Sequence, residues 1–143
     1  MKKSFSVVNG ELIVKEPSLD IIKWRGKVMD CLVESIVAHP QKEICFVLLS
    51  SKDGPKLYSG GPRKGFHNLV CVDISGHILW IADLPTGGVD FYARIVWSDD
   101  FPTDIMKIKL EIIDNTLIAF SYSGYLININ PETGRILWQV LIK

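Results

Sequence analysis

The side chains that could do chemistry in this sequence are few and scattered. Three histidines and three cysteines are spread over the 143 residues: His39, His67, His77, Cys31, Cys45 and Cys71. They lack the spacing of a zinc site or of a nucleophile with its base, and no glycine motif could hold a phosphate. His67 opens an apolar run and has the best claim to act as a ligand or base. We therefore expect no catalytic, metal or cofactor site, and no enzymatic activity.

The cysteines and the charge balance limit where this protein can be located and what it can bind. Each cysteine lies in an apolar run, where it packs as a small hydrophobe, and an odd number cannot all pair within one chain. The apolar stretch after the first lysines ends at Asn9, so no signal peptide is indicated. Sixteen basic residues balance sixteen acidic ones. We expect a cytoplasmic protein with buried thiols that binds neither membrane nor nucleic acid.

The elements that must position these residues come from an internal repeat that ends in tryptophan. Residues 126–138 read Leu-Ile-Asn-Ile-Asn-Pro-Glu-Thr-Gly-Arg-Ile-Leu-Trp, and residues 69–80 read Leu-Val-Cys-Val-Asp-Ile-Ser-Gly-His-Ile-Leu-Trp. A weaker copy at 12–24 keeps the aliphatic residues, the proline and the tryptophan but lacks the glycine. Gly76 and Gly134 suit the positive φ of a tight hairpin, so each copy predicts two strands and a turn. We expect Trp24, Trp80 and Trp138 to anchor contacts between sheets.

Further strand-like runs flank the three copies. Runs at 5–8, 44–49 and 117–121 precede them, runs at 28–38 and 91–97 follow the first two tryptophans, and a further strand is expected at 105–113. The 28–38 run also fits a helix by periodicity, but its position matches that of 91–97, which favours a strand. The sequence therefore predicts one all-β domain over 1–143. It consists of about three antiparallel four-stranded sheets, the first incomplete at its start, in repeat units of approximately 4–24, 28–84 and 90–143.

The unit from Leu117 to Trp138 contains Ser-Gly, Asn-Pro-Glu-Thr-Gly and Ile-Leu-Trp, and it resembles the pyrroloquinoline-quinone-type β-propeller repeat. The 69–80 copy matches the second half of that pattern. The resemblance implies blade-like sheets. Because a closed propeller typically has four or more blades, two to three blades predict an open, partial (half) β-propeller. The cofactor-binding dehydrogenases of that family are far longer, and their calcium-binding carboxylate cluster and paired cysteines have no counterpart here, so no cofactor is expected.

Two charged segments interrupt the repeat, and insertions on a repeat scaffold often form its binding face. The first segment, 51–66, interleaves basic and aromatic residues, with four candidate contact residues: Lys56, Tyr58, Arg63 and Lys64. It suits an anionic or protein partner, and the alternative is a solvated connection.

The second segment, 98–104, places Asp99, Asp100 and Asp104 around Phe101. An exposed Phe among carboxylates would suit a basic protein surface. The alternative is an ordinary turn with Phe101 folded onto the core. Because the two segments have opposite charge, neither indicates the continuous basic face that nucleic acid requires.

Three functions remain for such a chain. The first is a non-catalytic protein-binding protein, most concretely a cytosolic immunity protein of half-propeller type that binds and neutralises a bacterial toxin. If the toxin is a nuclease, we expect its basic groove to meet Asp99, Asp100 and Asp104. The second is a structural fragment that closes into a ring as a homodimer. The third, and weakest, is a small-ligand module near His67 and Trp80.

Overall fold

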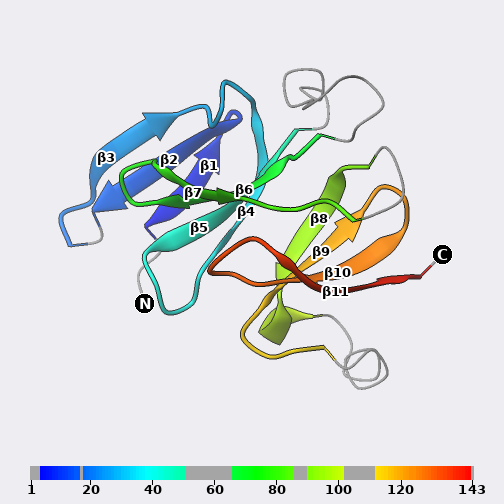
Figure 1. Ribbon diagram of the computed structural model, residues 1–143. Helices are drawn as coiled ribbons and strands as arrows, with labels where there is room; N and C mark the ends of the chain where they lie inside the picture. The colour runs from blue at the N-terminus through cyan, green and yellow to red at the C-terminus, as the bar shows by residue number, and fades with distance from the viewer. Residues whose placement is uncertain (1–3, 17, 51–65, 86–89, 102–111, 143) are drawn as a thin grey trace.

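The computed structural model describes residues 4–16, 18–50, 66–85, 90–101 and 112–142, which contain three antiparallel sheets in chain order (Figure 1). The first sheet is β1 (Phe5–Val8), β2 (Glu11–Glu16) and β3 (Ile21–Gly26). The second is β4 (Val33–Ala38), β5 (Ile44–Leu49), β6 (Leu69–Asp73) and β7 (Ile78–Ile81). The third is β8 (Tyr92–Trp97), β9 (Leu117–Ser121), β10 (Tyr125–Ile129) and β11 (Ile136–Leu141), with the 3-10 helix η2 (Ser98–Asp100) after β8. An all-β chain with an incomplete first sheet is confirmed.

Each sheet is a meander in which successive strands are neighbours, and the turns explain the repeat. Gly76 and Gly134 have φ values of 79° and 76°, as the hairpin pattern predicts. The first copy lacks this glycine, but Asp20 takes its place with φ of 53°. Aspartate tolerates the left-handed conformation better than most residues. The weaker copy at 12–24 therefore has the same hairpin with a different turn residue.

The core lies in two layers between the three sheets. Leu12, Val14, Val47, Val70 and Val72 are fully buried between the first and second sheets. Phe46, Leu69, Leu117, Ile127 and Ile129 are fully buried between the second and third sheets. Because the middle sheet is covered on both faces, β5 and β6 are almost continuously apolar.

The repeat tryptophans join each sheet to the next. Trp24 of the first sheet packs on Gly76 of the second, and Trp80 of the second packs on Gly134 of the third. A Cβ at Gly134 would lie 2.4 Å from Cε3 of Trp80, so the glycine allows the close approach. The Trp80 indole Nε1 also donates a hydrogen bond to the Pro131 carbonyl at 3.0 Å. The repeat therefore encodes the contact between neighbouring sheets as well as the hairpin.

The connection after the first sheet differs from the expectation. Residues 28–38 do not form one strand, because β4 begins at Val33 and a tight turn joins Val28 to Cys31 in an isolated bridge. Met29 and Asp30 take left-handed φ values in that turn. The strand expected at 105–113 falls largely outside the described residues. In the described part of the chain, no helix is long and apolar enough to cross a membrane.

Candidate binding surfaces

The acidic segment after β8 contains two exposed carboxylates and a buried ring. Asp99 and Asp100 lie in η2 and are exposed. Phe101 is only 8 % exposed and stacks on Phe120 with ring centroids 6.2 Å apart. The interpretation of Phe101 as an exposed anchor is therefore wrong, because its ring packs on the apolar outer face of the third sheet. Asp104 lies outside the described residues.

The basic segment 51–66 can be followed only at its end. Lys56, Tyr58, Arg63 and Lys64 lie outside the described residues. Phe66 is described, and it is buried and stacked on Phe91 at 4.7 Å, which in turn stacks on Tyr122 at 4.9 Å. This aromatic ladder of three rings (Phe66, Phe91, Tyr122) runs from the core to the surface. It lies at the Tyr92 end of β8, whereas η2 follows the opposite end.

The histidines hold local structure in this fold. The His39 Nδ1 accepts hydrogen bonds from the backbone N–H groups of Gln41 and Lys42, at 3.0 and 3.1 Å. Burial and the nearby Lys42 ammonium lower the pKa of His39, while the Glu132 carboxylate opposes them. The His67 Nδ1 lies 2.9 Å from the Ala82 carbonyl oxygen, to which it can donate. Both of these rings are thus engaged by backbone groups.

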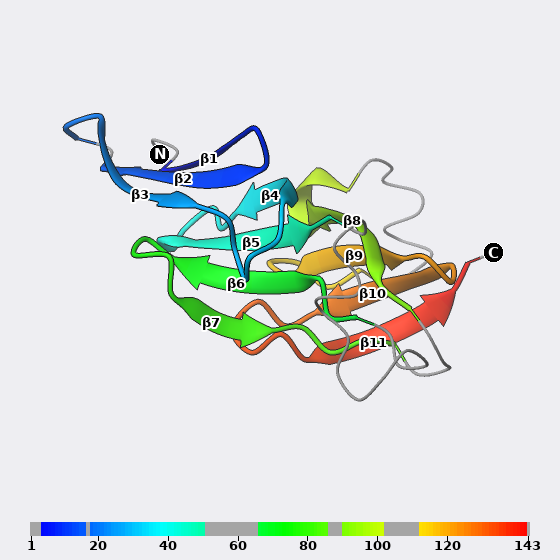
Figure 2. The same cartoon turned by 90° about the horizontal axis from the view of Figure 1, so that it is seen from above.

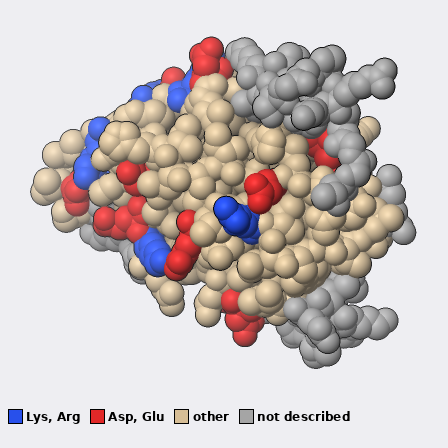
Figure 3. Space-filling model, in the orientation of Figure 1, with Lys and Arg blue, Asp and Glu red and all other residues tan. Residues whose placement is uncertain are grey.

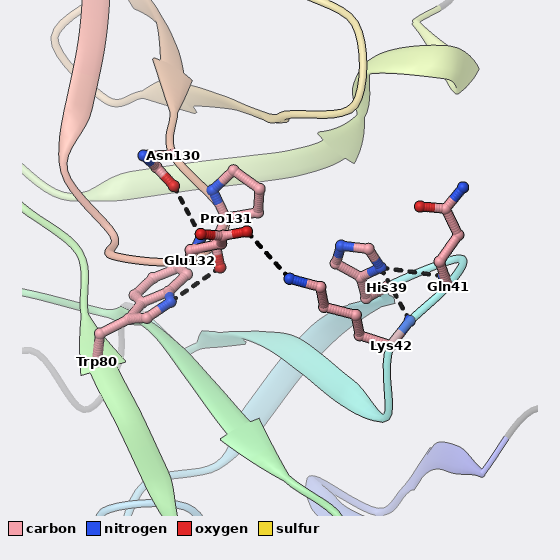
Figure 4. A network of polar contacts seen from close by, with 7 residues as sticks. All are labelled: His39, Gln41, Lys42, Trp80, Asn130, Pro131 and Glu132. Atoms are coloured by element: carbon pink, nitrogen blue, oxygen red, sulfur yellow. Dashed lines mark hydrogen bonds and ion pairs between the residues drawn. The ribbon is translucent and has the colours of Figure 1, made fainter.

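The His39 turn meets the third sheet through a polar cluster (Figure 4). The Lys42 Nζ lies 3.0 Å from Oε1 of Glu132, which belongs to the β10–β11 turn. Beside it, Trp80 donates to the Pro131 carbonyl of the same turn. The cluster therefore joins the second and third sheets. Its polar groups are directed at one another, which fits a structural role.

The three cysteines are buried free thiols in the described structure. Burial, aided by the Asp73 carboxylate, raises the pKa of Cys71 to about 12. Burial likewise raises the pKa of Cys45 far above the usual range of a thiol. Thiols with such pKa values are protonated at neutral pH and are poor nucleophiles. Among the described residues, no group of three or more His, Cys, Asp or Glu could hold a metal ion.

The outer face of the first sheet is charged. Arg25 on β3 lies 3.0 Å from the Glu11 carboxylate on β2, and Lys15 lies 3.4 Å from Asp20. In Figure 3, Lys, Arg, Asp and Glu are more frequent on the side of this sheet than over the rest of the described surface in that view. A repeat array with a polar outer face at its end is capped against further stacking.

The outer face of the third sheet is apolar and covered. Ile118 and Leu126 are fully buried there with Phe101, and Trp138 packs against the same cluster. The Arg94 guanidinium lies over the Phe120 ring, 5.2 Å from its centroid. Trp138 therefore occupies the position of Trp24 and Trp80, but no further described sheet follows it.

The outer rim of the molecule consists of the last strand of each sheet, β3, β7 and β11. Figure 2 shows these strands on the same side of their sheets. Neither β7 nor β11 contains a charged residue. Six aliphatic side chains on or directly after these two strands are between 42 % and 55 % exposed: Ile78, Leu79, Ile81, Leu137, Leu141 and Ile142. Edge strands of a sheet usually have charged residues that prevent association with other strands, so this apolar rim is unusual.

Sequence reasoning missed the rim and Tyr122 as candidate contacts. Only the tryptophans of the repeated Ile-Leu-Trp were singled out in the sequence; they are half-buried, whereas Ile78, Leu79 and Leu137 beside them are exposed. The signal available in the sequence was the absence of charged residues from the segments that form β7 and β11. For Tyr122, the signal was a large aromatic residue in a Ser-Tyr-Ser-Gly turn that does not require one.

Comparisons with known proteins identify the fold. No family model matches the sequence, and no curated protein matches it. The structure is similar to that of BamB from Moraxella catarrhalis, with a TM-score of 0.52 and 12 % identity over 96 % of this chain. It is also similar to the computationally designed protein Ika8, with a TM-score of 0.55 and 12 % identity over 98 % of this chain.

The chain spans about a third of each of these proteins, 32 % of BamB and 34 % of Ika8. Both are propeller proteins. The fold is an open, partial β-propeller. At this level of identity the likeness shows the fold alone.

Proposed function

We propose that this chain is a non-catalytic module that binds another protein through its outer rim. The observation that carries the proposal is the absence of charge from β7 and β11, together with their six exposed aliphatic side chains. Exposed apolar surface on a folded protein is a common feature of interaction sites. The structural engagement of His39 and His67 and the high pKa values of the thiols support a role without catalysis. The buried free thiols also support a cytoplasmic location.

The specific form that we propose is an immunity protein that binds and neutralises a bacterial toxin. Asp99 and Asp100 support it, because both are exposed and the last turn of η2 has no basic residue. These carboxylates, which have no ion-pair partner among the described residues, would steer a basic toxin surface, such as the groove of a nuclease, toward this end of the third sheet. Neutralising them in Asp99→Asn with Asp100→Asn should then slow association about tenfold at low salt and leave dissociation unchanged.

The test of the rim uses the product of the adjacent gene as the candidate partner. Leu79→Glu and Leu141→Glu place a charge on β7 and β11, at positions whose exposure leaves the fold intact. We expect each to weaken the complex at least tenfold, as is typical of central interface positions. Val8→Glu is the matched control, because Val8 is a comparably exposed aliphatic residue on the outer face of the first sheet. Equal affinity of all three variants in calorimetric titration would exclude the rim as the contact surface.

Closure of two copies into a ring is disfavoured by the charges on the first sheet. A ring would press the Glu11–Arg25 and Lys15–Asp20 pairs against the apolar face that Phe101 and Trp138 cover. Burying ion pairs without new polar partners costs several kcal/mol. Light scattering tests this directly. We expect the mass of one chain, and a dimer that Leu141→Glu abolishes would make a second copy the partner of the rim.

A further inference from the structure

The most exposed aromatic ring in the described structure that packs on another ring belongs to Tyr122. Its side chain lies in the β9–β10 turn and the residue is 63 % exposed. The turn itself is formed by other groups: the Gly124 N–H donates to the Ser121 carbonyl at 3.1 Å, and Gly124 has φ of 98°. The Ser121 hydroxyl accepts a hydrogen bond from the Tyr125 N–H at 3.2 Å. The fold of the turn therefore does not require an aromatic residue at this position.

The Tyr122 ring is held in place from one side only. It stacks on Phe91 with an interplanar angle of 12°, and Phe91 stacks on Phe66 with an angle of 15°. The Tyr122 N–H also donates to the Phe91 carbonyl at 2.9 Å. Because Phe91 occupies one face of the ring and the residue is largely exposed, the other face is open to solvent. An ordered, open ring binds a planar group with little loss of conformational entropy.

The charge beside this ring favours a cation. The Asp90 carboxylate is 4 % exposed and accepts hydrogen bonds from the backbone N–H groups of Phe91 and Ser123, at 2.9 and 3.0 Å. The described residues provide it with no ion-pair partner. The negative face of an aromatic ring attracts cations, and guanidinium adds planar stacking to this attraction. A nucleotide would bring its phosphate close to the Asp90 carboxylate, which opposes its binding.

The Tyr122 turn is continuous with the outer rim. The Ile142 N–H donates to the Gly124 carbonyl at 3.0 Å, and Leu141 pairs with Tyr125. Leu141 and Ile142 are the exposed residues at the end of β11. A partner that covers this end of the rim would therefore also reach the open face of the tyrosine ring.

We propose that Tyr122 binds the guanidinium of an arginine of the protein partner, stacked on the open face of the aromatic ladder and attracted by Asp90. The arginine would serve as a polar anchor beside the apolar contact of the rim. This inference rests on the proposed protein-binding function. Its chemistry can nevertheless be tested without the partner, because a single stacked guanidinium gives a weak but measurable site.

The experiment is an NMR titration of the full chain, ¹⁵N-labelled, with N-acetyl-arginine amide, N-acetyl-lysine amide and AMP as probes. We expect saturable shifts confined to residues 90–92 and 121–125 with the arginine probe. The lysine probe and AMP should bind about fivefold more weakly or not at all. Tyr122→Ser should weaken arginine binding about fivefold, and Tyr122→Phe should keep it because the stacking surface remains. Asp90→Asn keeps an acceptor oxygen for both N–H groups, removes the charge and should also weaken binding.

Three results would overturn the proposal. The first is the absence of a saturable shift with the arginine probe, and the second is binding of AMP as tight as that of the arginine probe. The third is loss of arginine binding in Tyr122→Phe, because it would mean that the probe binds by a hydrogen bond to the hydroxyl group and not by stacking on the ring. The dispersion of the ¹⁵N spectrum shows directly whether each variant is folded. Because these probes need no partner, failure here leaves the Leu141→Glu test intact. If the rim variants bind the partner normally but the arginine probe still binds at Tyr122, only the proposed function of the rim is rejected.

Discussion

The two ends of this partial propeller are finished in different ways. The outer face of the first sheet exposes the Glu11–Arg25 and Lys15–Asp20 ion pairs to solvent. The outer face of the third sheet is apolar and is covered in part by Phe101. In the series of sheets, Trp24 and Trp80 each contact the glycine of the next hairpin, whereas Trp138 has no described hairpin beyond it. The same contact between tryptophan and glycine thus occurs twice, and the outer faces of the first and third sheets differ in their polarity.

The largest effect should separate a tryptophan inside the array from the one at its end. Trp80→Ala removes the contact with Gly134 and the hydrogen bond to Pro131, and we expect it to lower the free energy of unfolding by about 3–5 kcal/mol. Trp138→Ala removes a ring packed on its own sheet, and we expect a loss of about 1–2 kcal/mol. Urea denaturation followed by circular dichroism measures both. If both variants lose the same free energy of unfolding, Trp138 is enclosed as Trp80 is, and the two tryptophans do not differ.

The second largest effect is expected for Phe101, which covers part of the outer face of the third sheet. Phe101→Ala removes a nearly buried ring from Phe120 and exposes apolar surface, so we expect a loss of about 2–3 kcal/mol. Dye binding and light scattering should show that the exposed face also promotes association. Asp100→Ala, one residue earlier and exposed, is the matched control and should leave the free energy of unfolding within about 0.5 kcal/mol of wild type. An unchanged stability in Phe101→Ala would contradict the assignment of this ring as a cover.

A smaller, pH-dependent effect should report on the joint between the second and third sheets. Because burial and the Lys42 ammonium lower the pKa of His39 in the folded protein, the unfolded chain binds more protons near pH 6.5. The stabilisation is therefore fully present above that pH and is lost as the pH falls through 6.5 toward the lowered pKa. His39→Asn keeps an acceptor for the two backbone N–H groups and does not titrate. As the pH falls from 8 to 5, the melting temperature should fall more steeply in the wild type than in this variant. If the melting temperatures of the two proteins change in parallel, His39 is not the source of the pH dependence.

The smallest effect is expected at the charged end. The Glu11–Arg25 pair is largely solvated, so Glu11→Ala should change the free energy of unfolding by less than about 1 kcal/mol. Its importance concerns association instead of stability. Glu11→Leu with Arg25→Leu makes this face apolar, and we expect the double variant to self-associate in sedimentation velocity experiments. A monomeric double variant would show that these charges are not what prevents association through this face.

The sequence predicted the sheets better than it predicted the surfaces. Hairpins are local, so the turn glycines and the alternation around them were enough to place β6–β7 and β10–β11. The tight turn at Met29 and Asp30 was missed, because the apolar residues on both sides of Asp30 favoured a continuous strand. Phe101 was ambiguous for another reason. Its neighbours in the chain are carboxylates, but its neighbours in space are Phe120 and the outer face of the third sheet.

The sequence by itself determined the repeat, the all-β class and the number of sheets, since these depend on residues a few positions apart. Only the tertiary structure decided what each sheet presents. The glycine that the hairpin needs for its φ is also the surface on which the preceding tryptophan packs, and that contact spans more than fifty residues. Likewise, the two copies of Ile-Leu-Trp have the same sequence, yet Ile78 is exposed on β7 and Ile136 is half-buried against the core. Which face of a strand is covered depends on the neighbouring sheet, and the strand's own sequence does not specify that neighbour.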